Sequence, residues 1–185
     1  MNTSTSNINS RLEESRFFYK NGQLTLALFK ARQLLILNPN LDRGYNILGS
    51  ISAAMQNYAH AVTNFNRALQ IQPVVQIYLK NLGNALIGMA NYSQAVKYLN
   101  KANDPNSRSL AIECLFIMKQ FSKVLEQLEL RSVSDTKNIR LASFSAYASS
   151  QLKFPDPFPF CKNPLSFIKF SNLSNYIEGI DDFTK

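Results

Sequence analysis

Small and apolar residues recur along this chain at one fixed interval. Three sets of equivalent positions are each spaced by about 34 residues: Ala27, Ala61 and Ala95; Ser15, Gly49 and Gly83; and Leu34, Ala68 and Ala102. Pro39 and Pro73 stand near the ends of the first two intervals, where a proline stops a helix that precedes it. A period of this length is typical of repeat proteins, so we expect a row of similar units.

Each interval is expected to fold as two helices joined by a turn. In the second helix of the second interval, Ala61, Phe65 and Ala68 follow one another at i, i+4 and i+7, which places them on one helical face. Gly49 in the first helix is expected to lie against Ala61, because residues this small let two helices cross closely while Phe65 fills the space beside them. One such unit cannot bury its apolar face alone, so several must stack.

The repeat resembles the tetratricopeptide family, whose unit is a helix-turn-helix of this length with a small residue in each helix. In the second unit the resemblance is carried by Tyr45, Leu48, Gly49, Tyr58, Ala61, Phe65, Ala68 and Pro73. It implies an all-α fold, a right-handed superhelical solenoid of stacked helix-turn-helix units, here followed by an irregular C-terminal arm rich in proline and phenylalanine.

The units differ along the chain. Residues 1–7 are polar and are expected to be disordered, and residues 8–153 are expected to form the solenoid. The first unit, residues 8–41, carries Arg11 and Glu14 where the pattern has an aromatic residue and leucine, as suits an end unit whose outer face meets water. A third unit spans residues 76–102. A divergent unit spans residues 107–130. Its Phe121 is equivalent to Tyr92 of the third unit, but the two are separated by fewer residues than equivalent positions in the other units.

A further helix, residues 136–153, is expected to cap the open end of the stack. Its apolar face is predicted from Ile139, Phe144, Tyr147 and Leu152.

The composition changes at residue 154, and residues 154–185 are expected to form a separate arm. Four prolines, at positions 155, 157, 159 and 164, exclude a regular helix there. The segment is either an extended arm packed on the last helices or the start of another domain. It resembles the junction of bacterial tetratricopeptide proteins fused to an iron and 2-oxoglutarate oxygenase-like domain, but it contains none of that family's metal ligands. We therefore expect a truncated or shortened relative, which a protease cuts first between residues 154 and 169.

The positive net charge of the chain indicates which classes of partner it can attract. The formal net charge is +8, and no Asp or Glu occurs between Arg43 and Asn103. Such a basic surface attracts acidic peptides, nucleic acid or anionic membranes, and it also keeps a protein soluble. The sequence lacks a stripe of alternating basic and aromatic residues of recognised type, so nucleic acid is the last of the partner classes considered.

The residues of catalysis are sparse. His60 is the one histidine and falls within a repeat helix, Cys114 and Cys161 lie far apart in the sequence, and no glycine-rich phosphate loop is present. We expect no enzymatic activity, no metal and no cofactor. The chain also lacks a secretory signal and an apolar run long enough to span a bilayer, so a cytoplasmic location is expected.

By the family resemblance, the free face of each first helix lines a concave groove. In this sequence that face would carry cations, amides and hydroxyls: Arg16, Tyr19, Arg43, Asn46, Ser50, Lys80 and Asn84. Amides can hydrogen-bond the backbone of an extended peptide, whereas Arg and Lys select carboxylates or phosphates. The alternative is that these are ordinary solvated helix residues.

The predicted function is therefore a non-catalytic protein-binding module, a scaffold that holds an extended or acidic peptide segment of a partner protein in this groove. One alternative is an N-terminal accessory module of a truncated oxygenase-like enzyme, and a third is weak nucleic-acid binding by the basic face. A subclass of the family holds the C-terminal carboxylate of chaperones with a Lys/Asn/Arg clamp. Leu12, Ile47 and Ile77 stand at three of the clamp positions here, so that clamp is not expected.

Overall fold

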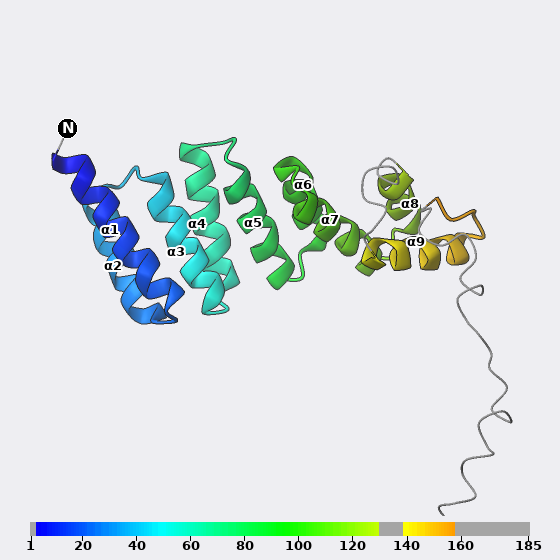
Figure 1. Ribbon diagram of the computed structural model, residues 1–185, viewed down its shortest axis with the longest axis horizontal. Coiled ribbons are helices and arrows are strands. Elements are labelled where there is room, and N and C mark those ends of the chain that lie inside the picture. The colour runs from blue at the N-terminus through cyan, green and yellow to red at the C-terminus, as the bar shows by residue number, and fades with distance from the viewer. Residues whose placement is uncertain (1–2, 130–138, 158–185) are drawn as a thin grey trace, which may run out of the picture.

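The computed structural model describes residues 3–129 and 139–157, and within these ranges every regular element is an α-helix. Figure 1 shows the helices in one row, with α1 and α2 at one end and α8 and α9 at the other. The helices are α1 (Thr3–Lys20), α2 (Leu24–Leu37), α3 (Asp42–Ala54), α4 (Tyr58–Ile71), α5 (Gln76–Gly88), α6 (Tyr92–Ala102), α7 (Pro105–Ile117), α8 (Phe121–Glu129) and α9 (Ile139–Leu152). The expected all-α repeat solenoid is confirmed.

The same turn closes every helix pair from α1–α2 to α7–α8. One residue in each turn has a left-handed backbone, with φ of 72° at Gly22, 59° at Gln56, 57° at Ala90 and 57° at Lys119. In the third turn Ala90 donates its N–H to the Ile87 carbonyl at 2.8 Å, and the next residue donates to the Leu86 carbonyl at 2.9 Å. This pair of bonds is the Schellman motif, which satisfies carbonyls at a helix end and turns the chain back.

The spacing of these turns along the chain changes once. Gly22, Gln56 and Ala90 are evenly spaced, whereas Lys119 follows Ala90 after a shorter interval. Helix α6 has 11 residues where α4 has 14, and only Asn103 and Asp104 connect α6 to α7, whereas residues 72–75 connect α4 to α5. The shorter helix and the shorter link together account for the shorter interval.

Small residues let the two helices of a unit approach, as the sequence predicts, but the partner differs from the expected one. A Cβ added at Gly49 would lie 2.6 Å from the Phe65 ring, and one added at Gly83 would lie 2.6 Å from Leu99. The nearest neighbour of Gly49 is therefore the Phe65 ring and not Ala61, because the bulky residue one turn further along reaches over the crossing point. In the first unit Ser15 takes this position and donates to the Ala27 carbonyl at 3.0 Å.

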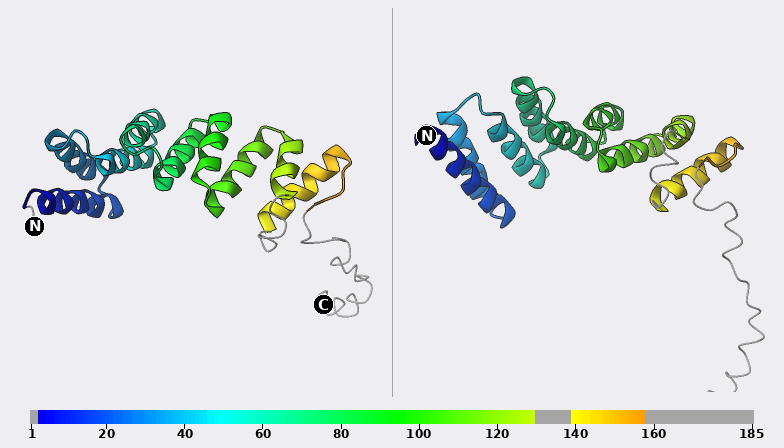
Figure 2. Two further views of the ribbon diagram at one scale, coloured as in Figure 1. Left: turned by 90° about the horizontal axis from the view of Figure 1, so that it is seen from above. Right: turned by 45° about the horizontal axis from the view of Figure 1, so that its top comes forward.

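The packing of successive units decides which face is concave. We call α1, α3, α5 and α7 the first helices and α2, α4, α6 and α8 the second helices. Contacts join α1 to α3, α3 to α5 and α5 to α7, whereas none joins α2 to α4 or α4 to α6 in the described part of the chain. Because the first helices touch one another and the second helices are spread apart, the first helices lie on the inner side of the curved row. The two turned views in Figure 2 show that the row also twists along its length.

In the fourth unit the two helices, α7 and α8, pack less closely on each other than the helix pairs of the earlier units. Ile112 stands where the second and third units carry Gly49 and Gly83, and it is fully buried. This side chain keeps α7 and α8 apart, and α8 packs more extensively on α9 than on α7. Rings of Phe116 and Phe144 stack between α7 and α9, with centroids 4.6 Å apart.

The buried face of α9 differs from the predicted one. Leu141, Ser145 and Ala148 are buried, whereas Tyr147 and Leu152 are 49% and 42% exposed. The prediction was based on the largest apolar residues. In the structure α9 packs on α8 with residues spaced i, i+4 and i+7, because the small side chains among them let the two helices approach closely. The side chain of Ile139 lies outside the described residues, and Phe144 is half-buried.

The N-terminal helix is longer than expected. It begins at Thr3, within the segment 1–7 for which the sequence predicts disorder. Once a helix is nucleated, adding a residue costs little, and Asn7 accepts a hydrogen bond from Arg11 Nε at 2.8 Å.

At the other end, the last described residues are tied to α9, since Ser145 donates its hydroxyl hydrogen to Asp156. Most of the predicted arm lies outside the described residues, so the division at residue 154 remains a prediction. Within residues 3–129 and 139–157, no helix is long and apolar enough to cross a membrane.

Candidate functional site

A cavity of about 230 Å³ lies on the inner side of the first three units. Its walls come from α1, α3 and α5, with two aromatic residues from α4: Tyr19, Ser50, Ala53, Ala54, Tyr58, Phe65, Asn81, Asn84 and Ala85. Three residues predicted for the groove, Tyr19, Ser50 and Asn84, are thus brought to one place from three helices. We call this cavity the inner cavity.

Amides dominate the polar wall of the inner cavity. Asn81 Nδ2 donates to Asn46 Oδ1 at 2.9 Å, and this bond links α5 to α3. Ser50 Oγ donates to the Asn46 carbonyl at 3.0 Å, so its oxygen still offers lone pairs. The Asn84 side chain is exposed and has no hydrogen-bond partner among the described residues. The wall therefore presents one free amide beside a fixed amide pair.

Asn81 is the groove residue that the sequence reasoning missed. It stands one repeat after Ile47, a residue that is only 6% exposed, so the same repeat position changes from apolar to polar between units. That change was the available signal. The prediction followed a narrower stripe of each first helix and omitted this position.

Tyr58 reaches the inner cavity because of a glycine. A Cβ added at Gly88, the last residue of α5, would lie 2.6 Å from the Tyr58 ring. Because Gly88 has no side chain, there is room for the ring of Tyr58, the first residue of α4, beside the end of α5. Asn57 accepts a hydrogen bond from the His60 N–H at 3.3 Å, which caps α4 at this residue.

The three predicted cations do not line the inner cavity, and each has a partner in the protein. Arg16 forms an ion pair with Glu13, with Nη1 and Oε1 2.7 Å apart. Arg43 donates from Nη2 to Asn9 Oδ1 at 3.1 Å and links α3 to α1. Asn9 is a neutral amide, so Arg43 keeps its positive charge for an outside ligand.

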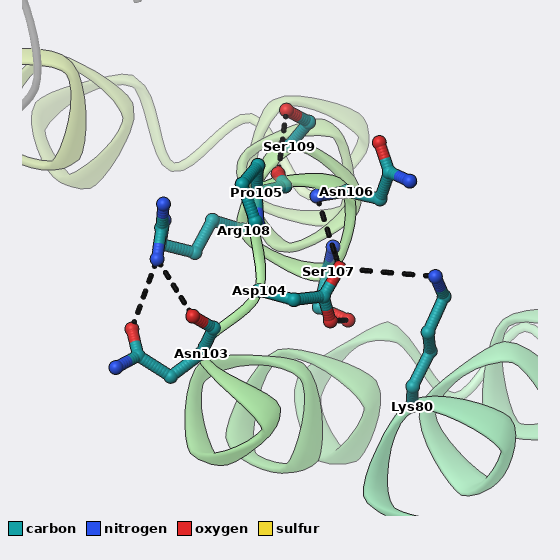
Figure 3. Close-up of polar contacts among 8 residues, drawn as sticks. All are labelled: Lys80, Asn103, Asp104, Pro105, Asn106, Ser107, Arg108 and Ser109. Atoms are coloured by element: carbon teal, nitrogen blue, oxygen red, sulfur yellow. Dashed lines mark hydrogen bonds and ion pairs between the residues drawn. The ribbon is translucent and has the colours of Figure 1, made fainter. Parts of the chain in front are cut away.

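Lys80 is engaged across units. Its Nζ lies 3.7 Å from Asp104 Oδ1, at the start of α7 (Figure 3). Asp104 also caps that helix, accepting from the Asn106 N–H at 3.1 Å and the Ser107 N–H at 3.2 Å. Lys80, within the stretch that lacks acidic residues, therefore forms an ion pair with the first acidic residue after that stretch. This pairing makes Lys80 less available to bind a partner than the sequence predicts.

Figure 3 also shows why Asp104 stays charged. Burial raises the pKa of its carboxyl, but hydrogen bonds from Ser107 and Asn106 and the charge of Lys80 outweigh burial and hold the pKa below its ordinary value of 3.8. On the other side of the link, Arg108 Nη1 donates to the Asn103 carbonyl at 2.7 Å. These contacts fix the angle between α6 and α7.

A buried tyrosine provides another link between first helices. Tyr78 donates its hydroxyl hydrogen to Asp42 Oδ2 at 2.6 Å, joining α5 to α3. Burial raises the pKa of Tyr78 well above its ordinary range, and the neighbouring Asp42 raises it further. The phenol therefore remains a neutral donor, and this bond supports the groove wall without offering chemistry.

Reactive groups are not gathered anywhere in the described part of the chain. Burial raises the pKa of the Cys114 thiol to about 11, and the Glu113 carboxylate adds to this shift. His60 is exposed on α4. Among residues 3–129 and 139–157, no three residues of the types His, Cys, Asp and Glu cluster closely enough to hold a metal ion.

A larger cavity, about 680 Å³, opens on the other side of the row between α4 and α6. It is lined by Asn66, Leu69, Gln70, Pro73, Val74, Leu79, Tyr98 and Lys101. None of the predicted groove residues lies there, and most of its wall comes from second helices.

Comparison with known protein families agrees with the repeat. The family model described as tetratricopeptide repeat matches residues 42–74, which cover α3 and α4, and residues 78–104, which cover most of α5 and all of α6. These two units are tetratricopeptide repeats. A search of curated protein sequences found no match.

Solved tetratricopeptide structures share the fold at low sequence identity. YrrB, a tetratricopeptide protein with an unusual peptide-binding site, superposes with a TM-score of 0.70 at 17% identity, over 85% of this chain and 88% of that one. A Pseudomonas aeruginosa pilF structure gives 0.68 at 16% identity, over 94% of this chain and 82% of that one. The first tetratricopeptide domain of Spaghetti (RPAP3), bound to the HSP90 peptide SRMEEVD, gives 0.58 at 13% identity, over 60% and 92%.

The positions of the chaperone clamp are apolar in this chain. Leu12 and Ile47 are buried, 1% and 6% exposed, in the cluster that joins the first two units. Ile77 is half exposed but carries no charge. None of the three can bind a carboxylate.

Proposed function

We propose that this protein is a non-catalytic interaction module that binds an extended peptide segment of a partner protein along its inner side. The observation that supports the proposal is the inner cavity, where Tyr19, Ser50 and Asn84 converge from three first helices. Solved neighbours of the same fold include one with a peptide-binding site and one with a bound peptide.

The chemistry of the cavity suits a peptide backbone. A side-chain amide can donate to one peptide carbonyl and accept from one N–H, so Asn84 can pair with an extended strand whatever its side chains. Tyr19 and Tyr58 provide flat apolar walls with a polar tip, which is the kind of surface enriched at interfaces. The proposed preference for acidic segments depends on Arg43, the groove cation that has no ion-pair partner among the described residues.

Selection from a random peptide library on the purified chain, followed by calorimetry, tests the proposal. For an enriched peptide, Asn84→Ala combined with Tyr19→Ala should raise Kd on the order of 10-fold or more. Gln94→Ala, an exposed amide on the second helix α6, is the matched control and should leave Kd unchanged. Enriched peptides that bind the double variant as tightly as the natural chain would contradict the inner cavity as the site.

The acidic preference has its own test. Arg43→Gln removes the charge while an amide can still reach Asn9, so it should weaken acidic peptides and leave neutral ones unchanged. Equal effects on both peptide classes would show that charge does not contribute to selection.

A further inference from the structure

The outward face of α2 is apolar. Leu26, Phe29, Ile36 and Leu37 are 37%, 55%, 77% and 59% exposed and lie away from the buried core residues of the same helix. Together with Gln33 they follow the spacing i, i+3, i+7, i+10 and i+11, which is one continuous stripe. We call these five residues the α2 stripe.

The repeat itself does not require an apolar residue at these positions. The residues at the equivalent positions of the next unit, in α4, are His60, Thr63, Arg67, Gln70 and Ile71. The first four of these are exposed and polar, although α4 occupies the same place in its own unit. The second unit therefore packs well with a polar outer surface, and the apolar character of the α2 stripe has another cause.

Nothing in the described part of the chain covers the α2 stripe. Helix α2 contacts only α1 and α3, and it lies at the end of the row in Figure 1. The sequence predicts a first unit whose outer face meets water, and Arg11 and Glu14 fit that expectation on α1, but α2 does not. A helix that is apolar almost all round is buried in a stable assembly, and an exposed apolar patch of this kind marks an interaction site.

The charges beside the stripe identify the chemistry of the partner. At 100° per residue, Lys30 and Arg32 fall on opposite borders of the α2 stripe, and α2 contains no acidic residue. Lys30 pairs with Glu14 of α1 at 2.7 Å, and Arg32 is exposed. A second copy of this chain packed antiparallel on α2 would bring Arg32 beside its own counterpart, with no acid on the helix to balance them.

We propose that the α2 stripe binds an amphipathic helix of a partner protein, in which an apolar stripe is bordered by acidic residues. The heptad-like spacing of the α2 stripe fits a facing helix, because apolar side chains three and four residues apart interlock with a matching row. Acidic residues of the partner pair with the exposed Arg32, whereas Lys30 keeps its ion pair with Glu14 of α1. This surface lies on a second helix and is separate from the inner cavity.

Two synthetic helical peptides of about three heptads test the proposal. Both carry leucine at the a and d positions, and they differ in having glutamate or lysine at e and g. In fluorescence anisotropy with the full chain, the glutamate peptide should bind on the order of 10-fold or more tightly than the lysine peptide. No binding of the glutamate peptide, or equal binding of both, overturns the proposal.

The repeat provides matched variants. Phe29→Thr combined with Ile36→Gln installs the residues that α4 carries at the same positions, so the fold should be retained while the glutamate peptide binds on the order of 10-fold more weakly. Thr63→Ala on α4 is the control and should not change binding. Unchanged binding in the double variant overturns the proposal. Sedimentation velocity that shows a dimer of the natural chain, dissolved by the double variant, overturns it in favour of a second copy on the stripe.

Discussion

The repeated turn offers a direct test of how backbone geometry contributes to the stability of this solenoid. Four turns share one left-handed position, but only the first fills it with glycine: Gly22, followed by Gln56, Ala90 and Lys119. For a residue with a Cβ, the left-handed conformation costs roughly 1–2 kcal/mol, because the Cβ approaches the following carbonyl oxygen. Ala90→Gly should therefore remove strain from the folded chain.

The expected gain is smaller than that strain. Glycine loses more backbone freedom on folding than alanine, which costs roughly 0.5–1 kcal/mol. The net effect of Ala90→Gly should be a gain of about 0.5–1 kcal/mol in the free energy of unfolding, or about 1–4 °C in Tm for a chain of this size. Urea titration followed by circular dichroism measures the change.

The first turn supplies the reverse change. A Cβ added at Gly22 would meet nothing within 4 Å, so Gly22→Ala tests the backbone alone and should lower the free energy of unfolding by about 0.5–1 kcal/mol. Ala146→Gly, at an exposed mid-helix position of α9, should also destabilise, because the same substitution in a right-handed segment only adds entropy to the unfolded chain. If Ala90→Gly destabilises as Ala146→Gly does, the strain assigned to the turn is absent.

Two further predictions concern titratable groups. Because hydrogen bonds and Lys80 hold the pKa of Asp104 below its ordinary value of 3.8, its carboxylate stabilises the fold fully above about pH 4, and this contribution is lost as the pH falls through the folded-state pKa. The difference in unfolding free energy between the natural chain and Asp104→Asn should therefore shrink between about pH 5 and 2, and a difference independent of pH would contradict the assignment. Burial raises the pKa of Cys114 to about 11, so its thiol should resist alkylation at about pH 8 in the folded chain and react once urea unfolds the chain. Mass spectrometry of the peptide that contains Cys114 measures the extent of alkylation. Rapid labelling of this residue in the folded chain would contradict its burial.

The repeat and its helix pairs could be predicted from sequence because their causes are local and periodic. Ala61, Phe65 and Ala68 fall on one helical face whatever lies elsewhere in the chain, and all three are buried. The close approach at Gly49 was predictable for the same reason, since only a very small residue permits it. Its partner, the Phe65 ring, depended on how far a side chain extends across the crossing of two helices.

The groove was only partly predictable, since its geometry arises from three units stacked on one another. The sequence indicated that the first helices carry free polar residues, and Tyr19, Ser50 and Asn84 do meet at the inner cavity. It did not indicate that Asn81 would join them through Asn46, or that Lys80 would pair with Asp104 across the next junction. Such pairings depend on the angle between units, which the links and caps set over many residues.

What the sequence by itself determined is the repeat period, the positions where helices must cross closely, and the absence of a local catalytic motif, because each depends on residue types at fixed spacings along the chain. What only the tertiary structure decided is which surfaces remain uncovered. The stripe from Leu26 to Leu37 looks like core in the sequence, but α2 packs only on α1 and α3, and the positions of this stripe face away from both, as the equivalent positions of α4 do. Burial is a property of the stack, and the face of the helix on which an apolar residue lies decides whether it becomes core or binding surface.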